Sequence, residues 1–79
     1  MRAARTFSAE RLRHAMDEHG VSGYSLERAL ARNGVRVARA TILAHANGER
    51  MPRAGTVGAY AAYFNVLVDY FYAEVESQC

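Results

Sequence analysis

Residues 46–52 read Ala46-Asn47-Gly48-Glu49-Arg50-Met51-Pro52, and this stretch marks where one helix ends and a polar turn leads to the next. Gly48 suits a helix end, because glycine adopts a left-handed backbone conformation at little cost. Pro52 cannot continue the helix, since it has no backbone N–H and its ring clashes with the preceding turn. The stretch therefore predicts a helix on each side, one ending near Ala46 and one beginning near Ala54.

Helical periodicity continues toward the N-terminus. The stripe from Leu12 to His19 has the i, i+3, i+4, i+7 spacing of one helix face. Serines stand where N-caps are needed, and glycines stand where helices must end. The three helices predicted on this side are bounded by Ser8 and Gly20, by Ser22 and Asn33-Gly34, and by Ala38 and Asn47-Gly48.

The same periodicity continues toward the C-terminus. The stripe from Val57 to Phe64 predicts a fourth helix from about Ala54 to Phe64, which Asn65 can end in a left-handed conformation. A short fifth helix is indicated by Val68, Phe71 and Val75. Strand-like alternation bounded by turn dipeptides is absent, so the predicted fold is all-α, with five short helices around one core.

Length and composition favour one soluble domain. The chain has 79 residues, 51% of them hydrophobic, and no repeat or long linker divides it, so residues 1–79 form one predicted domain with a core over about 7–72. Cys79 is the single cysteine, which excludes an internal disulfide and favours a reducing cytoplasm. No apolar run approaches the ~20 residues that span a bilayer, so we expect no membrane association.

Patterns that support catalysis or metal binding are missing. The sequence has no paired-carboxylate, Ser/His/Asp or Cys/His arrangement. His14 and His19 are five positions apart, hence on different faces of a helix, and neither has a partner at metal-ligand spacing. We therefore expect no enzymatic activity, no metal, no cofactor and no small-molecule ligand.

Charge is distributed unevenly along the chain. The net charge is +2, but residues 1–53 carry all ten arginines and five acidic residues, hence +5. Residues 54–79 carry three acidic residues and no arginine or lysine, hence −3. The first part is suited to meet phosphate, and the aromatic-rich second part is suited to packing and self-association.

Two short helices joined by a Gly-containing turn, the second followed by a Gly-capped basic loop, form the layout of a helix-turn-helix. In this order and spacing, residues 7–72 resemble the lambda-repressor-like (Cro/CI, XRE-type) DNA-binding family. The pieces that carry the resemblance are Ala46 to Pro52, Thr56-Val57, Ala61, Phe64-Asn65-Val66 and Asp69-Tyr70-Phe71. The family usually has about twelve residues between the glycines that end its second and third helices. Here Gly34 and Gly48 are fourteen apart, as in an extended-turn subgroup of actinobacterial and phage regulators.

The resemblance implies a set of DNA contacts. The third helix would present Arg39, Ala40 and Leu43 to base edges, and Arg39 is the residue expected to bond guanine. Phosphate contacts would come from Tyr24, Ser25, Arg36, Asn47, Arg50 and Arg53. Gly23 departs from the polar residue that many relatives carry, and the third helix is mostly apolar, so direct readout of bases is expected to be sparse and DNA shape to matter more.

His45 departs from the family at an inward position that is usually aliphatic. A half-buried, hydrogen-bonded histidine is the favoured interpretation, and a DNA contact is the alternative. Asn47 has a similar alternative, because its position is also explained by the end of the helix alone.

The family commonly dimerises near its last helix. Six of the eight aromatic residues lie between Tyr60 and Tyr72, and five short helices cannot enclose them all. Tyr63, Leu67, Tyr70 and Tyr72 are therefore the predicted dimer surface, within or beside the segment 66–79. A two-fold homodimer would place two recognition helices roughly 34 Å apart on a palindromic operator.

The sequence thus predicts a sequence-specific, double-stranded DNA-binding transcriptional regulator. The resemblance favours a repressor of phage or prophage type, associated with the nucleoid in a bacterial cytoplasm. The alternative is a protein-interaction adaptor that keeps the helix-turn-helix frame and binds protein through the apolar face of Ala40, Leu43 and Ala44.

Overall fold

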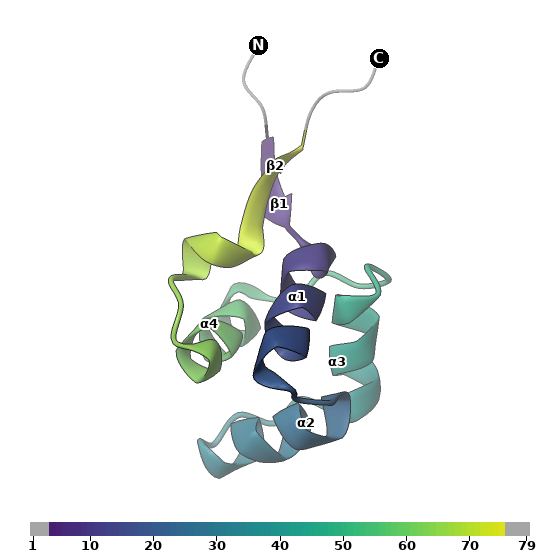
Figure 1. The fold of residues 1–79 in the computed structure, drawn as a ribbon, viewed down its shortest axis with the longest axis vertical. Coiled ribbons are helices and arrows are strands. Elements are labelled where there is room, and N and C mark those ends of the chain that lie inside the picture. The colour runs from purple at the N-terminus through teal and green to yellow at the C-terminus, as the bar shows by residue number, and fades with distance from the viewer. Residues whose placement is uncertain (1–3, 76–79) are drawn as a thin grey trace.

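Four α-helices make up most of the described chain (Figure 1). The computed structural model describes the backbone of residues 4–75 and the side chains of residues 5–73. The helices are α1 (Ala9–His19), α2 (Gly23–Arg32), α3 (Arg39–Ala46) and α4 (Ala54–Phe64). The mostly helical architecture that the periodicity predicts is confirmed.

The helix ends follow the predicted capping residues. The hydroxyl oxygens of Ser8 and Ser22 accept from the backbone N–H groups of Arg11 and Ser25, which satisfies one free donor at each helix start. A residue with left-handed backbone conformation ends α1 and another ends α4. Two more lie in the turns that follow α2 and α3. The residues concerned are Gly20, Gly34, Gly48 and Asn65, with φ of 63°, 83°, 78° and 59°.

The predicted fifth α-helix is wrong. Val68–Phe71 forms a single 3₁₀ turn, η1, and the chain then extends as β2 (Tyr72–Val75). This strand pairs antiparallel with β1 (Ala4–Phe7), with Phe7 opposite Tyr72, so the described chain contains a two-stranded sheet. The spacing of Val68 and Phe71 fits one turn of helix, but pairing with the distant N-terminal segment determines the conformation after it. The N–H of Ser8 extends this pairing by donating to the carbonyl of Phe71 (2.7 Å).

The core lies between the four helices and η1. Its fully buried side chains come from each of these elements: Leu12, Leu26, Leu30, Ile42, Val57, Tyr60 and Phe71. Phe7 adds the end of β1, where its ring stacks on Phe71 with centroids 6.1 Å apart. The ribbon of β1 and β2 stands at one end of the molecule and α2 at the other (Figure 1).

Candidate nucleic-acid interface

Helix α2 begins directly against the outward face of α3. Gly23, the first residue of α2, is buried, and a Cβ there would lie 3.1 Å from Leu43 Cδ2 and 3.3 Å from Arg39 Cγ. Contacts this short are tighter than ordinary packing, so a side chain at position 23 would require Leu43 and Arg39 to shift by a few tenths of an ångström. The departure at Gly23 is therefore explained by helix packing.

The three predicted base-contact residues lie together on one exposed side of α3. Arg39, Ala40 and Leu43 are all exposed, whereas Ile42 and His45 point into the core. Leu43 is 44% exposed. This side offers one guanidinium and an apolar strip.

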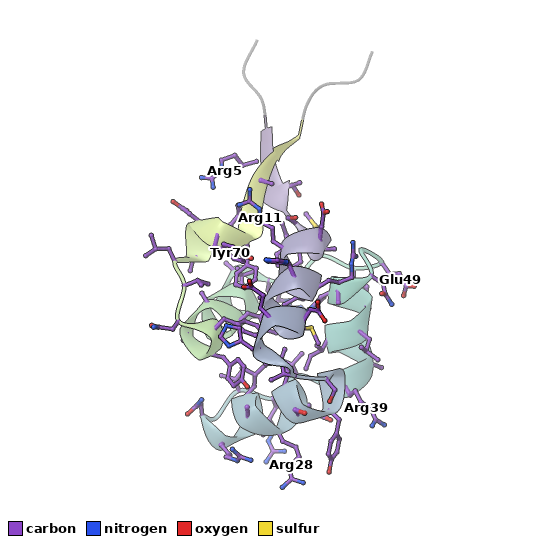
Figure 2. All side chains as sticks on the ribbon, viewed as in Figure 1. Arg5, Arg11, Arg28, Arg39, Glu49 and Tyr70 are labelled. Atoms are coloured by element: carbon purple, nitrogen blue, oxygen red, sulfur yellow. The ribbon has the colours of Figure 1, made fainter. Side chains whose placement is uncertain are left out.

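Two guanidinium groups lie close to the ring of Tyr24. The Cζ atoms of Arg28 and Arg39 lie 5.6 Å and 5.8 Å from the centroid of its half-exposed ring, within cation–π range. Arg28 also donates from Nη1 to the Tyr24 hydroxyl (2.9 Å). Figure 2 shows Arg28 and Arg39 at the end of the molecule formed by α2. Sequence reasoning missed Arg28, although its i, i+4 spacing from Tyr24 is a usable signal.

Ser25 takes part in the N-cap of α2. Its backbone N–H donates to Ser22 Oγ (3.1 Å), and the two hydroxyl oxygens lie 2.9 Å apart. Both side chains are exposed at the helix start, next to Tyr24. The predicted phosphate contacts at Tyr24 and Ser25 therefore lie at one positive helix end.

A second basic surface is a cleft of about 300 Å³ beside α3. Arginines from three segments line it: the segment before α3, the loop after α3 and the residue preceding α4. The lining residues are Arg36, Val37, Ala38, Thr41, His45, Arg50, Met51, Arg53 and Thr56. Helices α3 and α4 both begin at the cleft, at Ala38 and Arg53, and neither start has a side-chain cap. Their free N–H groups add to the positive potential that the arginines create.

Asn47 does not line this cleft. It is the C-cap of α3, and its backbone N–H donates to the carbonyl of Leu43 (2.9 Å). Its position is thus the helix end that the sequence offered as an alternative, and its side chain is exposed.

His45 lies at the floor of the cleft and is buried. Its Nδ1 is 2.8 Å from the hydroxyl oxygen of Tyr60, and its ring meets those of Tyr60 and Phe7 edge-on. Burial, and secondly the charge of Arg50, lower the pKa of His45 below its ordinary value of 6.5. The predicted hydrogen bond is confirmed, and the residue is more deeply buried than the half-buried position that the sequence predicts.

Apart from Arg28, the arginines of the described residues fall into two groups. Arg5, Arg11 and Arg13 bond backbone carbonyls elsewhere in the fold: Arg5 those of Asp69 and Tyr72, Arg11 that of Tyr70 (2.9 Å), and Arg13 that of Ala46. Within residues 4–75, no hydrogen bond or ion pair to protein is made by the guanidinium groups of Arg32, Arg36, Arg39, Arg50 and Arg53. Four of these five lie in the cleft or on the exposed side of α3, so the unbonded cations gather at the predicted interface.

The predicted dimer residues are exposed to different degrees. Leu67 is 79% exposed, whereas Tyr63, Tyr70 and Tyr72 are half-buried. The ring of Tyr70 packs on Phe71 and lies 5.7 Å from the Arg11 guanidinium carbon. Most of the aromatic surface that the sequence left unassigned is thus covered within the chain, and Leu67 with its neighbour Val68 is the exposed apolar part of this segment.

Neither metal clusters nor membrane-spanning helices are found in the described chain. No three His, Cys, Asp or Glu side chains among its residues are grouped so that they could hold a metal ion. None of its helices combines the length and apolar character needed to cross a membrane. Cys79 lies outside the described residues. Comparison of this chain with protein-family models, curated proteins and solved structures yields no match.

Proposed function

We propose that this protein is a sequence-specific, double-stranded DNA-binding regulator with a lambda-repressor-like helix-turn-helix formed by α2 and α3. The observation that carries the proposal is the gathering of guanidinium groups without hydrogen-bond or ion-pair partners around α3. Arg39 lies at the first turn of α3, beside the start of α2, and Arg36, Arg50 and Arg53 line the basic cleft. A surface of unbonded arginines and helix N-termini has the chemistry that binds a phosphate backbone. The resemblance described above assigns α3 to the major groove.

Base recognition in this proposal depends on the exposed side of α3. Arg39 bonds O6 and N7 of a guanine, a pairing worth about 1–3 kcal/mol of discrimination. Leu43 and Ala40 contact thymine methyl groups. Arg36, Arg50 and Arg53 bind phosphates on one side of the groove, and the start of α2 binds them on the other.

The proposed assembly is a homodimer on a palindromic operator, acting as a repressor of phage or prophage type in the bacterial cytoplasm. The exposed Leu67 supports self-association near the C-terminal end of the described chain. Two-fold symmetry would then place the two α3 helices in successive major grooves on one side of the duplex.

The first test is duplex binding as a function of salt. Each neutralised phosphate contributes about 0.9 to the slope of log K against log salt, so the three cleft arginines alone predict a slope of about −2.7 per protomer on random duplex. Selection of bound sites from a random-sequence duplex pool should then return two symmetric half-sites. Absence of duplex binding at low salt would contradict the proposal.

Two arginine variants separate base contact from phosphate contact. Arg39→Ala should weaken binding at one base position of each half-site, and Arg50→Ala should weaken specific and random sites alike. Both residues are exposed and neither guanidinium group makes a hydrogen bond or ion pair to another described residue, so both variants should fold normally. Equal losses on all sites for Arg39→Ala, or a loss confined to one base position for Arg50→Ala, would reverse these assignments.

The alternative function is a protein-interaction adaptor. The exposure of Leu43 beside Ala40 favours it, because an apolar strip on a helix also suits a protein partner. A folded protein that binds no duplex at low salt, yet loses a protein partner on Leu43→Glu substitution, would support this alternative.

A further inference from the structure

The Nε2 atom of His45 has no protein partner, although only 5% of the residue is exposed. In the described chain, every buried side-chain nitrogen or oxygen atom has a hydrogen-bond partner. Nδ1 is satisfied by Tyr60, so Nε2 must retain contact with solvent. His45 lines the basic cleft, the open space that adjoins this side chain.

Tyr60 determines which ring nitrogen of His45 carries the proton. The Tyr60 side chain is fully buried, and burial raises its pKa, so the hydroxyl group keeps its hydrogen. A buried hydroxyl group must donate that hydrogen, and His45 Nδ1 is the acceptor that the described residues provide. Nδ1 of the neutral ring is then an acceptor, and the proton resides on Nε2.

We propose that the cleft binds a phosphate group, with His45 Nε2–H as the hydrogen-bond donor at its floor and Arg36, Arg50 and Arg53 as the charged rim. The proposal deepens the proposed function and rests on it in one respect: the phosphate is assigned to the DNA backbone. His45 becomes a ligand in addition to a core residue, and Tyr60 becomes a positioning residue that acts through it.

The surroundings of Nε2 suit an anion. Three guanidinium groups, none bonded to the described protein, line the same cleft, together with the hydroxyl-bearing side chains of Thr41 and Thr56. The uncapped starts of α3 and α4 add backbone N–H groups. A neutral imidazole donor fits this site, because a second hydrogen on Nδ1 would face the Tyr60 hydroxyl hydrogen and leave it without an acceptor.

The test is nitrogen-15 NMR of the histidine rings at pH 7.5. In the free protein, His45 should show the Nε2–H form with Nδ1 as the bare nitrogen. Adding inorganic phosphate at constant ionic strength should shift the His45 Nε2 resonance, and the same ionic strength of chloride should not. His14 and His19 are internal controls, because both are exposed on α1 and neither lines the cleft. An Nδ1–H form, or a His45 response no larger than that of His14, would overturn the proposal.

A variant separates the role of Tyr60 from core packing. Tyr60→Phe keeps the ring and removes the hydroxyl group, so Nδ1 loses its donor and the proton is no longer held on Nε2. We expect about 3- to 10-fold weaker phosphate and duplex binding, with the helical circular dichroism unchanged. Unchanged affinity together with an unchanged His45 spectrum would show that Tyr60 does not act through the histidine.

A short duplex distinguishes this inference from the proposed function. If phosphate and duplex both shift His45 Nε2, both proposals are supported. If phosphate shifts the His45 Nε2 resonance and the duplex neither shifts it nor binds, the subsite is supported as a site for free phosphate and the DNA-binding proposal is contradicted. If the duplex binds with steep salt dependence and leaves His45 unchanged, DNA binding stands and this inference is wrong.

Discussion

His45 couples folding to proton binding at the scale of one residue. Its pKa is lowered in the folded protein, so between that value and 6.5 the unfolded chain binds a proton that the folded chain does not. Stability contributed by this residue is therefore fully present above pH 6.5 and decreases as the pH falls below it. Burial is the main cause, and the positive charge of Arg50 acts in the same direction.

This sign gives a measurable difference between wild type and His45→Gln. The urea midpoint of the wild type should fall between pH 7.5 and pH 5.5 by more than that of the variant, because glutamine does not titrate. His14 and His19 are present in both proteins, so their titration cancels in the comparison. An equal fall in both midpoints would mean that His45 binds its proton equally in the folded and unfolded states.

The sequence predicts a residue's orientation where local spacing determines it, and does not predict contacts with a distant partner. The inward direction of His45 follows from the α3 periodicity. Its partner Tyr60 lies fifteen residues away on another helix, and no local pattern identifies it. The role of Gly23 is equally hidden from local patterns, because the residues that a Cβ there would meet, Leu43 and Arg39, lie on the next helix. The arginines proposed for the site are exposed, and the absence of hydrogen bonds from their guanidinium groups to the described protein follows from the fold.

At the scale of elements, two glycines in helices test how α2 packs on α3. Gly58 in α4 has open space where a Cβ would lie, so Gly58→Ala should raise the free energy of unfolding by about 0.5–1 kcal/mol through lower chain entropy in the unfolded state. At Gly23 the same methyl group meets Leu43 and Arg39 and must displace them. We expect the free energy of unfolding of Gly23→Ala, measured in urea, to be lower than that of Gly58→Ala by about 1 kcal/mol or more.

DNA binding provides a second measurement on the same pair. Gly23→Ala displaces two residues of the proposed base-contact surface, so it should also alter the selected sequence. Gly58→Ala should leave the selected sequence unchanged. Equal stabilisation by both variants would show that α2 and α3 have more room than the structure gives them.

The elements themselves were predictable as far as their determinants are local. Serine caps, left-handed glycines and apolar stripes lie within each helix, so all four helix positions were confirmed to within a residue or two. The strands were missed because β1 and β2 lie at opposite ends of the described chain and stabilise each other. A pattern of Val68, Phe71 and Val75 fits a helix until Phe7 and Tyr72 are known to pair.

For the whole molecule, charge and function are proposed to divide along the long axis. Arg5 and Arg11 hold the segment from Asp69 to Tyr72 near the ribbon, while Arg28 and Arg39 lie at the α2 end (Figure 2). The net +5 of residues 1–53 is thus shared between arginines that bond backbone carbonyls and arginines that remain available to an anion. A dimer formed through Leu67 would leave the α2 end of each protomer free for DNA.

Leu67→Glu tests that arrangement. Burial of a leucine side chain contributes about 1.5–3 kcal/mol, so a buried carboxylate in its place should raise the dimer dissociation constant by about ten- to a hundredfold, measured by sedimentation equilibrium. Affinity for a full palindromic site should fall, and affinity for an isolated half-site should stay unchanged, because the base-contact side of α3 is untouched. Ala62→Glu is the control, since it places the same charge at another exposed position of the C-terminal part. If Leu67→Glu sediments like the wild type, self-association does not use Leu67, and the half-sites must be bridged through another surface.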